Sequence, residues 1–408
     1  MRKVKKDKLI LELCDCADIS IKDSTKINEF LNKHYLIKEK KDKSFINKIK
    51  SLWEKDNVNY YLEHEEKGRF AFVDVAKAIA MIFIYIGHWV SPNLTLFAYS
   101  FHLFLFFMIS GFFALHMFKD SFFSFIKKLF LRLILPLFLW ACLAFVFSNL
   151  DNKLQLKSLS NLFLHTGDIM PNYWFIPALV STSLYYWILS KSIKKPWIIV
   201  IITFILNICF GETGFISVAH ISIFDHIPLA SWFNFNSFIT YGFWYSLGVA
   251  IFPLLLKFVS YVESGSKFKR RSIKFICYLS IALSSILLLH SSSFQIIGKY
   301  KYVFSIFVIF RAIIIITSVF YFSYLFRESK FLNKVGTHSL VYVGMEFIIH
   351  GFIAVTIMQS LNLGVYSFVD SISIITYNLI VIYLVSKVAD IVDHYFPILN
   401  GKSIKTNQ

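Results

Sequence analysis

Long apolar runs, separated by short polar connections, fill the chain from about residue 70 onwards. About ten of them approach the roughly 20 residues that a helix needs to cross a bilayer. They lie at 70–90, 95–118, 129–148, 173–190, 196–213, 237–257, 273–292, 303–326, 338–360 and 366–388. Stretches such as IIVIITFILNICF lack the alternation of a barrel strand. Because lipid offers no partner for an unpaired backbone group, the pattern predicts an all-α polytopic membrane protein with about ten transmembrane helices.

The first 68 residues follow a different pattern. They are rich in lysine, and segments such as INEFLNKHYLIKEK space their apolar residues as a helix does. We therefore expect a small helical cytoplasmic segment over 1–68, a membrane domain over 69–390 and a cytoplasmic tail over 391–408. The spacing in the first segment fits a small helical domain or an amphipathic element on the membrane surface, and it indicates no function.

The chain has 42 Lys and Arg residues, 25 Asp and Glu residues and a formal net charge of +17. From residue 70 onwards, 25 basic and 12 acidic residues leave +13. Most of these basic residues lie in alternate connections between the apolar runs, which is the positive-inside pattern and not a sign of nucleic-acid binding. We expect both termini in the cytoplasm. Frequent Lys, Ile and Phe suggest a bacterial genome rich in A and T, and hence a bacterial plasma membrane.

The five cysteines do not form a disulfide framework. Cys14 and Cys16 form a lone CxC, which fits a free cytosolic pair or half of a metal site. A second pair of cysteines or histidines at a site-like spacing does not stand out, so no metal is predicted.

The first apolar run, FVDVAKAIAMIFIYIGHWV, carries three ionisable side chains: Asp74, Lys77 and His88. At about 100° per residue they lie on one face of a helix, with His88 about 16 Å beyond Lys77 along its axis. Ionisable groups inside a membrane are costly and usually functional. Asp74 and Lys77 fit an ion pair near the cytoplasmic end, whereas His88 lies near the outer end.

The short connection SPNL makes the first two runs an antiparallel hairpin, so His102 returns to about the depth of His88. Two histidines at one level fit a general base and its partner. His102 fits a core histidine equally well. Further along this run, Ser110 and Gly111 fit a close contact between helices.

Two other polar features lie in later runs. Glu346 and His350 are one helical turn apart. Trp174, in NYWFIPAL, fits a residue that stacks on a bound ligand or a member of the interfacial aromatic belt. We predict that Trp174, Glu346 and His350 contact the substrate.

Five motifs in order resemble the membrane acyltransferase-3 family over roughly residues 69–390. They are FVDVAKAIAMIFIYIGHW, FHLFLFFMISGFF, KKLFLRLILPLFLW, NYWFIPAL and LNKVGTHSLVYVGMEFIIH. The chain departs from the family pattern in three places. Lys77 stands where many members have Arg, as it does in fucose-acetylase-like relatives. Leu129 replaces the first arginine of an Arg-x-x-Arg motif that ends at Arg132, and Glu346 stands where many members have His.

The resemblance implies transfer of an acyl group, commonly acetyl from acetyl-CoA, to a hydroxyl of a cell-surface or lipid-linked glycan. His88 is then the expected base, with His102 and Asp74 as further catalytic candidates. Positive charge suits the CoA phosphates. The candidate cofactor-binding residues are Lys77, Lys127, Lys128 and Arg132.

Other functions remain open. Buried Asp, Lys, Arg, Glu and His residues also suit the translocation path of a transporter or flippase for a lipid-linked glycan. A polysaccharide polymerase and an inactive relative of the acyltransferases are further alternatives. The order of the motifs and the lack of an evident internal repeat favour the acyltransferase. A transporter would need no acyl-CoA and would leave its substrate unmodified.

Overall fold

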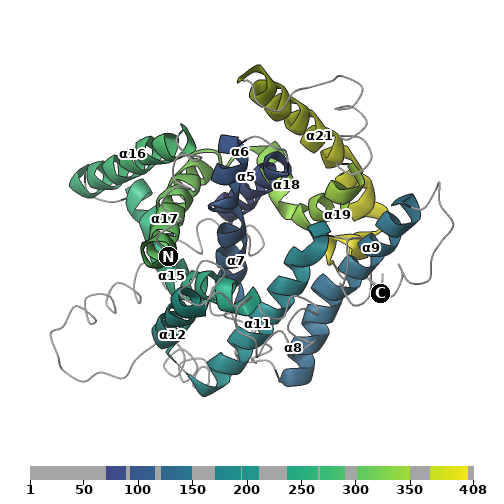
Figure 1. The fold of residues 1–408 in the computed structure, drawn as a ribbon, viewed down its shortest axis with the longest axis horizontal. Helices are drawn as coiled ribbons and strands as arrows, with labels where there is room; N and C mark the ends of the chain where they lie inside the picture. Colours follow the sequence, from purple (N-terminus) through teal and green to yellow (C-terminus); the bar gives the residue numbers. More distant parts are fainter. Residues whose placement is uncertain are drawn as a thin grey trace, which may run out of the picture. The chain divides into compact units, whose positions relative to one another are not determined.

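The computed structural model describes residues 70–88, 92–114, 121–148, 171–193, 195–210, 237–264, 267–289, 301–349 and 368–402. Every regular element within these residues is a helix (Figure 1). The all-α prediction is therefore confirmed. The predicted N-terminal segment, 1–68, and His350 lie outside the described residues.

The helices follow one another in a simple order. They are α5 (Ala71–Gly87), α6 (Pro92–Tyr99), α7 (His102–Phe112), α8 (Phe122–Leu129), the π-helix η2 (Phe130–Ile134), α9 (Leu135–Ser148), the 3-10 helix η3 (Pro171–Trp174), α11 (Phe175–Ser192), α12 (Pro196–Phe210), α15 (Ser237–Ser264), α16 (Lys267–Leu289), α17 (Lys301–Leu325), α18 (Lys330–Thr337), α19 (Ser339–Ile349), α21 (Phe368–Tyr395) and the 3-10 helix η8 (Pro397–Asn400). Each predicted run contains at least part of one of them.

Four stretches are long and apolar enough to cross a membrane. They are Thr95–Phe112, Ser237–Leu256, Ile306–Leu325 and Ile375–Tyr395, and α12 is apolar but shorter. These stretches have the length and composition expected of a protein that crosses the membrane several times. The number of about ten spans stays a prediction.

The described residues form two compact units. One contains Phe70 and Ala250–Ile276, in which the rings of Phe70 and Phe252 meet edge to face with 5.3 Å between their centroids. The other contains Ala71–Val249 and the residues from Cys277 onwards. All the residues discussed below belong to the second unit.

Helix α5 lies at the centre of this unit and packs against α6, α7, α17, α18, α19 and α21 (Figure 1). Its buried residues include Ala76, Ala78 and Ala80, whose small side chains let neighbouring helices approach. The closest approach is at Gly336 of α18, where a Cβ atom would overlap the backbone carbonyl of Asp74. The late motif LNKVGTHSL therefore packs directly on the cytoplasmic end predicted for the first run.

The predicted run 95–118 is broken in the structure. Helix α6 ends at Tyr99 and α7 begins at His102. The hydroxyl of Ser100 donates to the carbonyl of Phe97 at 2.5 Å, and the backbone N–H of Phe101 donates to that of Ala98 at 3.2 Å. Such tight local bonds replace the regular helical ladder. The break places Tyr99 and His102 side by side.

Gly111 and Gly248 form a reciprocal close contact between α7 and α15. A Cβ on Gly111 would overlap the backbone carbonyl of Tyr245, and a Cβ on Gly248 would overlap that of Met108. The predicted role of Gly111 in close packing is thus confirmed.

Gly111→Ala is expected to lower the free energy of unfolding by about 1–3 kcal/mol, because α7 and α15 must move apart. Gly242→Ala is the matched control, since a Cβ there would meet only side-chain atoms, at 3.7–3.9 Å. Both changes add the same methyl group to a helix. Thermal unfolding of the purified proteins in lipid nanodiscs compares them, and equal melting temperatures would contradict the packing argument.

Candidate active site

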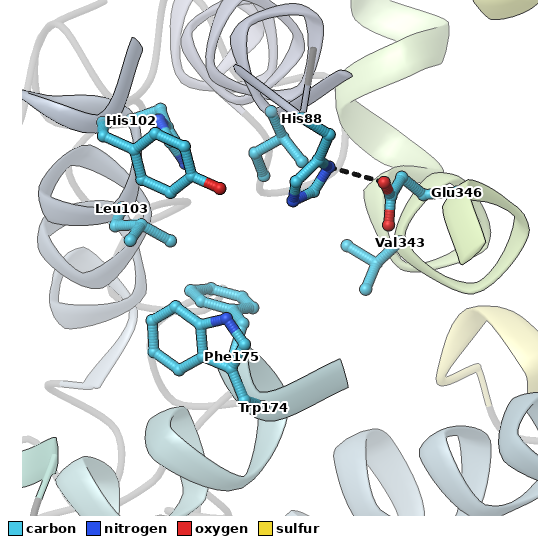
Figure 2. A pocket seen from close by; sticks show the side chains of 9 residues that line it. His88, His102, Leu103, Trp174, Phe175, Val343 and Glu346 are labelled. Atoms are coloured by element: carbon cyan, nitrogen blue, oxygen red, sulfur yellow. Dashed lines mark ion pairs between the residues drawn. The ribbon is translucent and has the colours of Figure 1, made fainter. Parts of the chain in front are cut away.

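The site begins where α5 ends. The backbone N–H of His88 donates to the carbonyl of Ile84 at 3.2 Å, so the helical path continues to the histidine. Nδ1 of His88 lies 2.5 Å from Oε1 of Glu346 on α19 (Figure 2). The Glu346 side chain is only 3% exposed, whereas that of His88 is 25% exposed. The structure therefore pairs a partly accessible histidine with a buried carboxylate.

Two buried tyrosines, Tyr85 of α5 and Tyr173 of η3, bond to the backbone of α19. The hydroxyl of Tyr85 donates to the carbonyl of Tyr342 at 2.8 Å, about one turn before the paired residues on both helices. The hydroxyl of Tyr173 donates to the carbonyl of Gly344 at 2.6 Å. At Gly344 a Cβ atom would overlap the indole of Trp140. These contacts fix the position from which Glu346 reaches His88.

A carboxylate at Nδ1 has two consequences for an imidazole. It favours the tautomer that carries its proton on Nδ1 and keeps its lone pair on Nε2. It also stabilises the imidazolium that forms when Nε2 takes up a proton. The pair of His88 and Glu346 has the chemistry of a general base held in one orientation.

A pocket contains this pair together with aromatic and apolar side chains (Figure 2). Its lining residues are Ile84, His88, Tyr99, His102, Leu103, Trp174, Phe175, Val343 and Glu346. The structure brings together His88, His102, Trp174 and Glu346 from four separate motifs. All four were predicted as site residues, but the predicted partner of His88 was His102, whereas the carboxylate paired with it is that of Glu346.

Tyr99 contacts both histidines. Its ring centroid is 6.5 Å from that of His88 and 5.1 Å from that of His102, and both contacts are edge to face. Gly87 lets α5 and α6 approach here, because a Cβ atom on it would lie 3.2 Å from that of Ala98, which is tighter than an ordinary contact. Helix α6 is held by Arg311 of α17, whose guanidinium donates to the carbonyl of Leu96 at 2.7 Å.

Asp74 and Lys77 form an ion pair of 3.1 Å on α5. The Lys77 ammonium also lies 5.2 Å from the centre of the Phe113 ring. Neither residue lines the pocket. The structure therefore supports the ion-pair interpretation of Asp74, and it does not bring this carboxylate to either histidine.

The other predicted CoA-binding residues lie on the helix that begins at α8. Ser121 caps α8 by accepting a hydrogen bond from the backbone N–H of Ser124 at 3.4 Å. Lys127 and Lys128 lie in its last turn and are exposed. Arg132 is also exposed and lies in the π-helix η2, a distortion that is frequent at functional sites. None of the three lines the pocket.

The C-terminal end of the described chain packs against the turn that carries Arg132. Gly401 adopts a left-handed φ of 66°, and a Cβ atom there would lie 2.6 Å from the Arg132 carbonyl oxygen. The indole N–H of Trp140 donates to the carbonyl of Leu399 at 3.0 Å. Helix α21 continues to Tyr395, beyond the domain boundary expected at 390.

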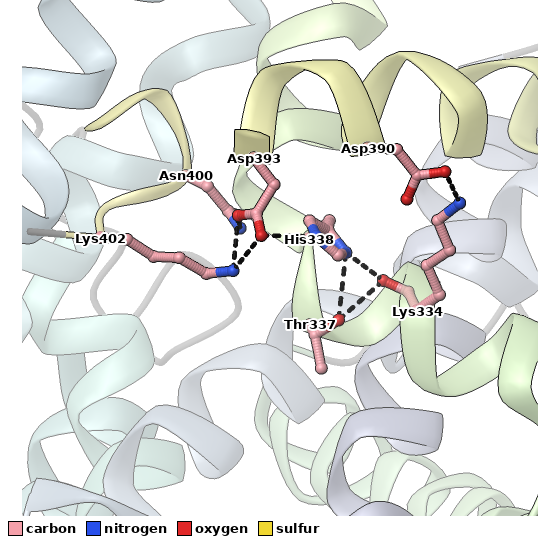
Figure 3. Close-up of polar contacts among 7 residues, drawn as sticks. All are labelled: Lys334, Thr337, His338, Asp390, Asp393, Asn400 and Lys402. Carbon is pink, nitrogen blue, oxygen red and sulfur yellow. Dashed lines mark hydrogen bonds and ion pairs between the residues drawn. The ribbon is translucent and has the colours of Figure 1, made fainter. Parts of the chain in front are cut away.

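A polar network secures this segment (Figure 3). The Asp393 carboxylate accepts hydrogen bonds from Lys402 at 2.6 Å and from Asn400 at 3.0 Å, and it lies 3.5 Å from Nε2 of His338. Asp390, three residues earlier on α21, pairs with Lys334 at 2.5 Å. The Asp390 side chain is 57% exposed, against 29% for Asp393.

Asp393→Asn is expected to lower the free energy of unfolding by about 1–2 kcal/mol, because it weakens charge-assisted bonds that connect α18, α21 and η8. Asp390→Asn is the control and should cost less than about 1 kcal/mol, because its ion pair is more exposed. Thermal unfolding measures both. A larger loss for Asp390→Asn would show that the network does not secure the C-terminal segment.

Several residues of the site were not singled out in the sequence. Tyr85, Tyr99, Tyr173 and Tyr342 lie in a chain with 21 Tyr and 46 Phe residues, so their aromatic character carries no signal. Within the described part of the chain, no cluster of three or more His, Cys, Asp or Glu side chains is arranged to hold a metal ion.

Comparison with known proteins gives one positive result. No curated protein and no solved structure matches the chain. A family model described as an acyltransferase domain matches residues 70–387. The match includes both His88 and Glu346 and covers most of the chain. This protein therefore belongs to the membrane acyltransferase-3 family.

Proposed function

We propose that this acyltransferase is an O-acetyltransferase of a bacterial plasma membrane, which transfers acetyl from acetyl-CoA to a hydroxyl of a cell-surface or lipid-linked glycan. The observation that carries the proposal is the contact of 2.5 Å between His88 and Glu346 in a pocket that also contains Trp174. A base held by a buried carboxylate is what activation of a neutral hydroxyl requires.

His88 would carry out both proton transfers, and Glu346 would support it. Nε2 of His88 takes the proton of the acceptor hydroxyl as its oxygen attacks the thioester carbonyl. Glu346 stabilises the resulting imidazolium. When the tetrahedral intermediate collapses, the C–S bond breaks and His88 returns the proton to the departing sulfur. The products are the O-acetyl glycan and CoA with a free thiol.

The donor would be bound from the cytoplasmic side. Lys77 lies about 16 Å from His88 along α5, which suits a donor whose phosphates lie at one end and whose thioester reaches the other. Lys127, Lys128 and Arg132 would add positive charge for the phosphates. In this arrangement both termini are cytoplasmic, and Trp174 stacks on the acceptor sugar.

Mass analysis of surface and lipid-linked glycans tests the proposal. Cells that lack the gene should lose the mass increment of an acetyl group, and the wild-type gene should restore it. A gene carrying His88→Ala should fail to restore it. His394→Ala is the matched control and should restore it, because His394 is exposed on α21 and does not line the pocket. Unchanged acetylation with accumulated glycan intermediates would instead indicate transport or polymerisation.

A further inference from the structure

His102 differs from His88 in the group that fixes its ring. Nδ1 of His102 lies 2.5 Å from the backbone carbonyl oxygen of Ala98. A carbonyl oxygen can only accept a hydrogen bond, so Nδ1 must carry the proton. Nε2 of the neutral ring then has a lone pair and no hydrogen. His102 is thus prepared to accept one hydrogen bond at Nε2.

The surroundings of His102 favour this neutral form. Its residue surface is 3% exposed, and its ring meets those of Tyr99 and Phe101 edge to face at 5.1 Å and 6.4 Å. A buried cation needs a counter-charge. Glu346 supplies one to His88, whereas no carboxylate in the described ranges is paired with His102. The two histidines therefore have different chemistry.

Nε2 of His102 is a candidate for contact with substrate. Buried histidines in protein cores usually satisfy both ring nitrogens. Among the residues that the structure describes, Nδ1 is bonded to Ala98 and no residue is hydrogen-bonded to Nε2. The side chain lines the same pocket as His88, Trp174 and Glu346 (Figure 2).

We propose that His102 binds the acceptor, with Nε2 accepting a hydrogen bond from a second hydroxyl of the sugar. The contact orients the sugar so that the hydroxyl to be acylated meets His88, and Tyr99 contacts both imidazole rings. Because neutral Nε2 can only accept, the pocket selects sugars that present a donor there and disfavours deoxy sugars. This inference rests on the proposed function.

Two substitutions distinguish the roles of the two ring nitrogens of His102. The amide of His102→Asn reaches about as far as Nδ1, so it can keep the bond to Ala98 but leaves the position of Nε2 empty. The longer His102→Gln brings an amide to that position. His394→Asn is the control for the same change outside the pocket, since that residue is exposed.

The assay uses the purified variants in lipid nanodiscs, acetyl-CoA, and glycans extracted from cells that lack the gene. We expect His102→Asn to raise the KM for the glycan extract about 10- to 100-fold, with a smaller fall in kcat and no comparable rise in the KM for acetyl-CoA. His102→Gln should recover most of the lost affinity. Both variants should keep the wild-type pH dependence of kcat.

Other outcomes would overturn the inference. Equal loss of melting temperature in both variants, with an unchanged KM for the extract, would make His102 a structural residue. A lower kcat with an altered pH dependence would make it a partner of the base. Failure of the wild-type protein to acetylate the extract would instead overturn the proposed function.

A measurement on the wild-type protein does not depend on the folding of either variant. The dipeptide Phe–His occurs once in the sequence, at 101–102, so paired carbon and nitrogen labels select His102 in solid-state NMR. The expected spectrum between about pH 6 and pH 8, around the ordinary range for histidine titration, shows a neutral ring protonated at Nδ1. An imidazolium, or a ring protonated at Nε2, would overturn the inference.

Discussion

His88→Asn is expected to lower kcat for acetyl transfer about 10²- to 10⁴-fold, the usual contribution of general acid–base catalysis. An asparagine amide can replace Nδ1 beside Glu346, but it cannot accept the proton of the acceptor hydroxyl. The KM for acetyl-CoA should change little, because the proposed phosphate-binding residues lie elsewhere. Single-turnover transfer from labelled acetyl-CoA to the extracted glycan measures the effect.

The control for this experiment is His394→Asn, which makes the same change on an exposed surface of α21. It should retain the wild-type rate. If His88→Asn transferred acetyl at a rate within about twofold of the wild type, far less than a general base contributes, His88 would not be the base. Another residue would then have to act as the general base.

Glu346→Gln is expected to lower kcat by a similar factor, about 10²- to 10⁴-fold, while the protein remains folded. Glutamine is nearly isosteric, but it cannot stabilise the imidazolium, and it no longer selects the tautomer with the lone pair on Nε2. Glu346→Asp keeps the charge but withdraws it from Nδ1, which lies 2.5 Å away in the wild type. Its kcat should fall between those of the wild type and Glu346→Gln.

A double-mutant cycle makes the second prediction sharper. If Glu346 acts through His88, the variant carrying both His88→Asn and Glu346→Gln should be no slower than His88→Asn alone. The measurement is kcat for the four proteins under identical conditions. Multiplicative losses would show that Glu346 acts independently of His88, for example on the acceptor.

The residues behind these two predictions differ in how far the sequence alone could place them. His88 and Asp74 with Lys77 stand on one face of a single helix, and helical periodicity is a local property. The ion pair of Asp74 and Lys77 spans one turn, and the structure shows it at 3.1 Å. Spacing was enough to anticipate it.

The partner of His88 shows the limit of such reasoning. His102 and Glu346 were both candidates, because a hairpin brings one near and a late motif carries the other. The choice depends on the register between α5 and α19, which Tyr85 sets through a hydrogen bond to the backbone carbonyl of Tyr342, while Tyr173 of η3 bonds to that of Gly344 on α19. Close packing of Gly336 on Asp74 adds to it. The register between α5 and α19 cannot be read from the residue pattern of either helix alone.

The amino-acid sequence by itself determined the helical, multi-pass character of the protein, the motif order of the acyltransferase family and the face of α5 that carries its ionisable residues. These properties follow from hydrophobic length and helical periodicity, which act over neighbouring residues. Only the tertiary structure decided that Glu346 holds His88, that α6 ends at Tyr99 beside His102, and that the C-terminal segment packs on Arg132. Each of these depends on how distant helices approach one another, and that is set by glycine contacts and side chain to backbone hydrogen bonds across helices.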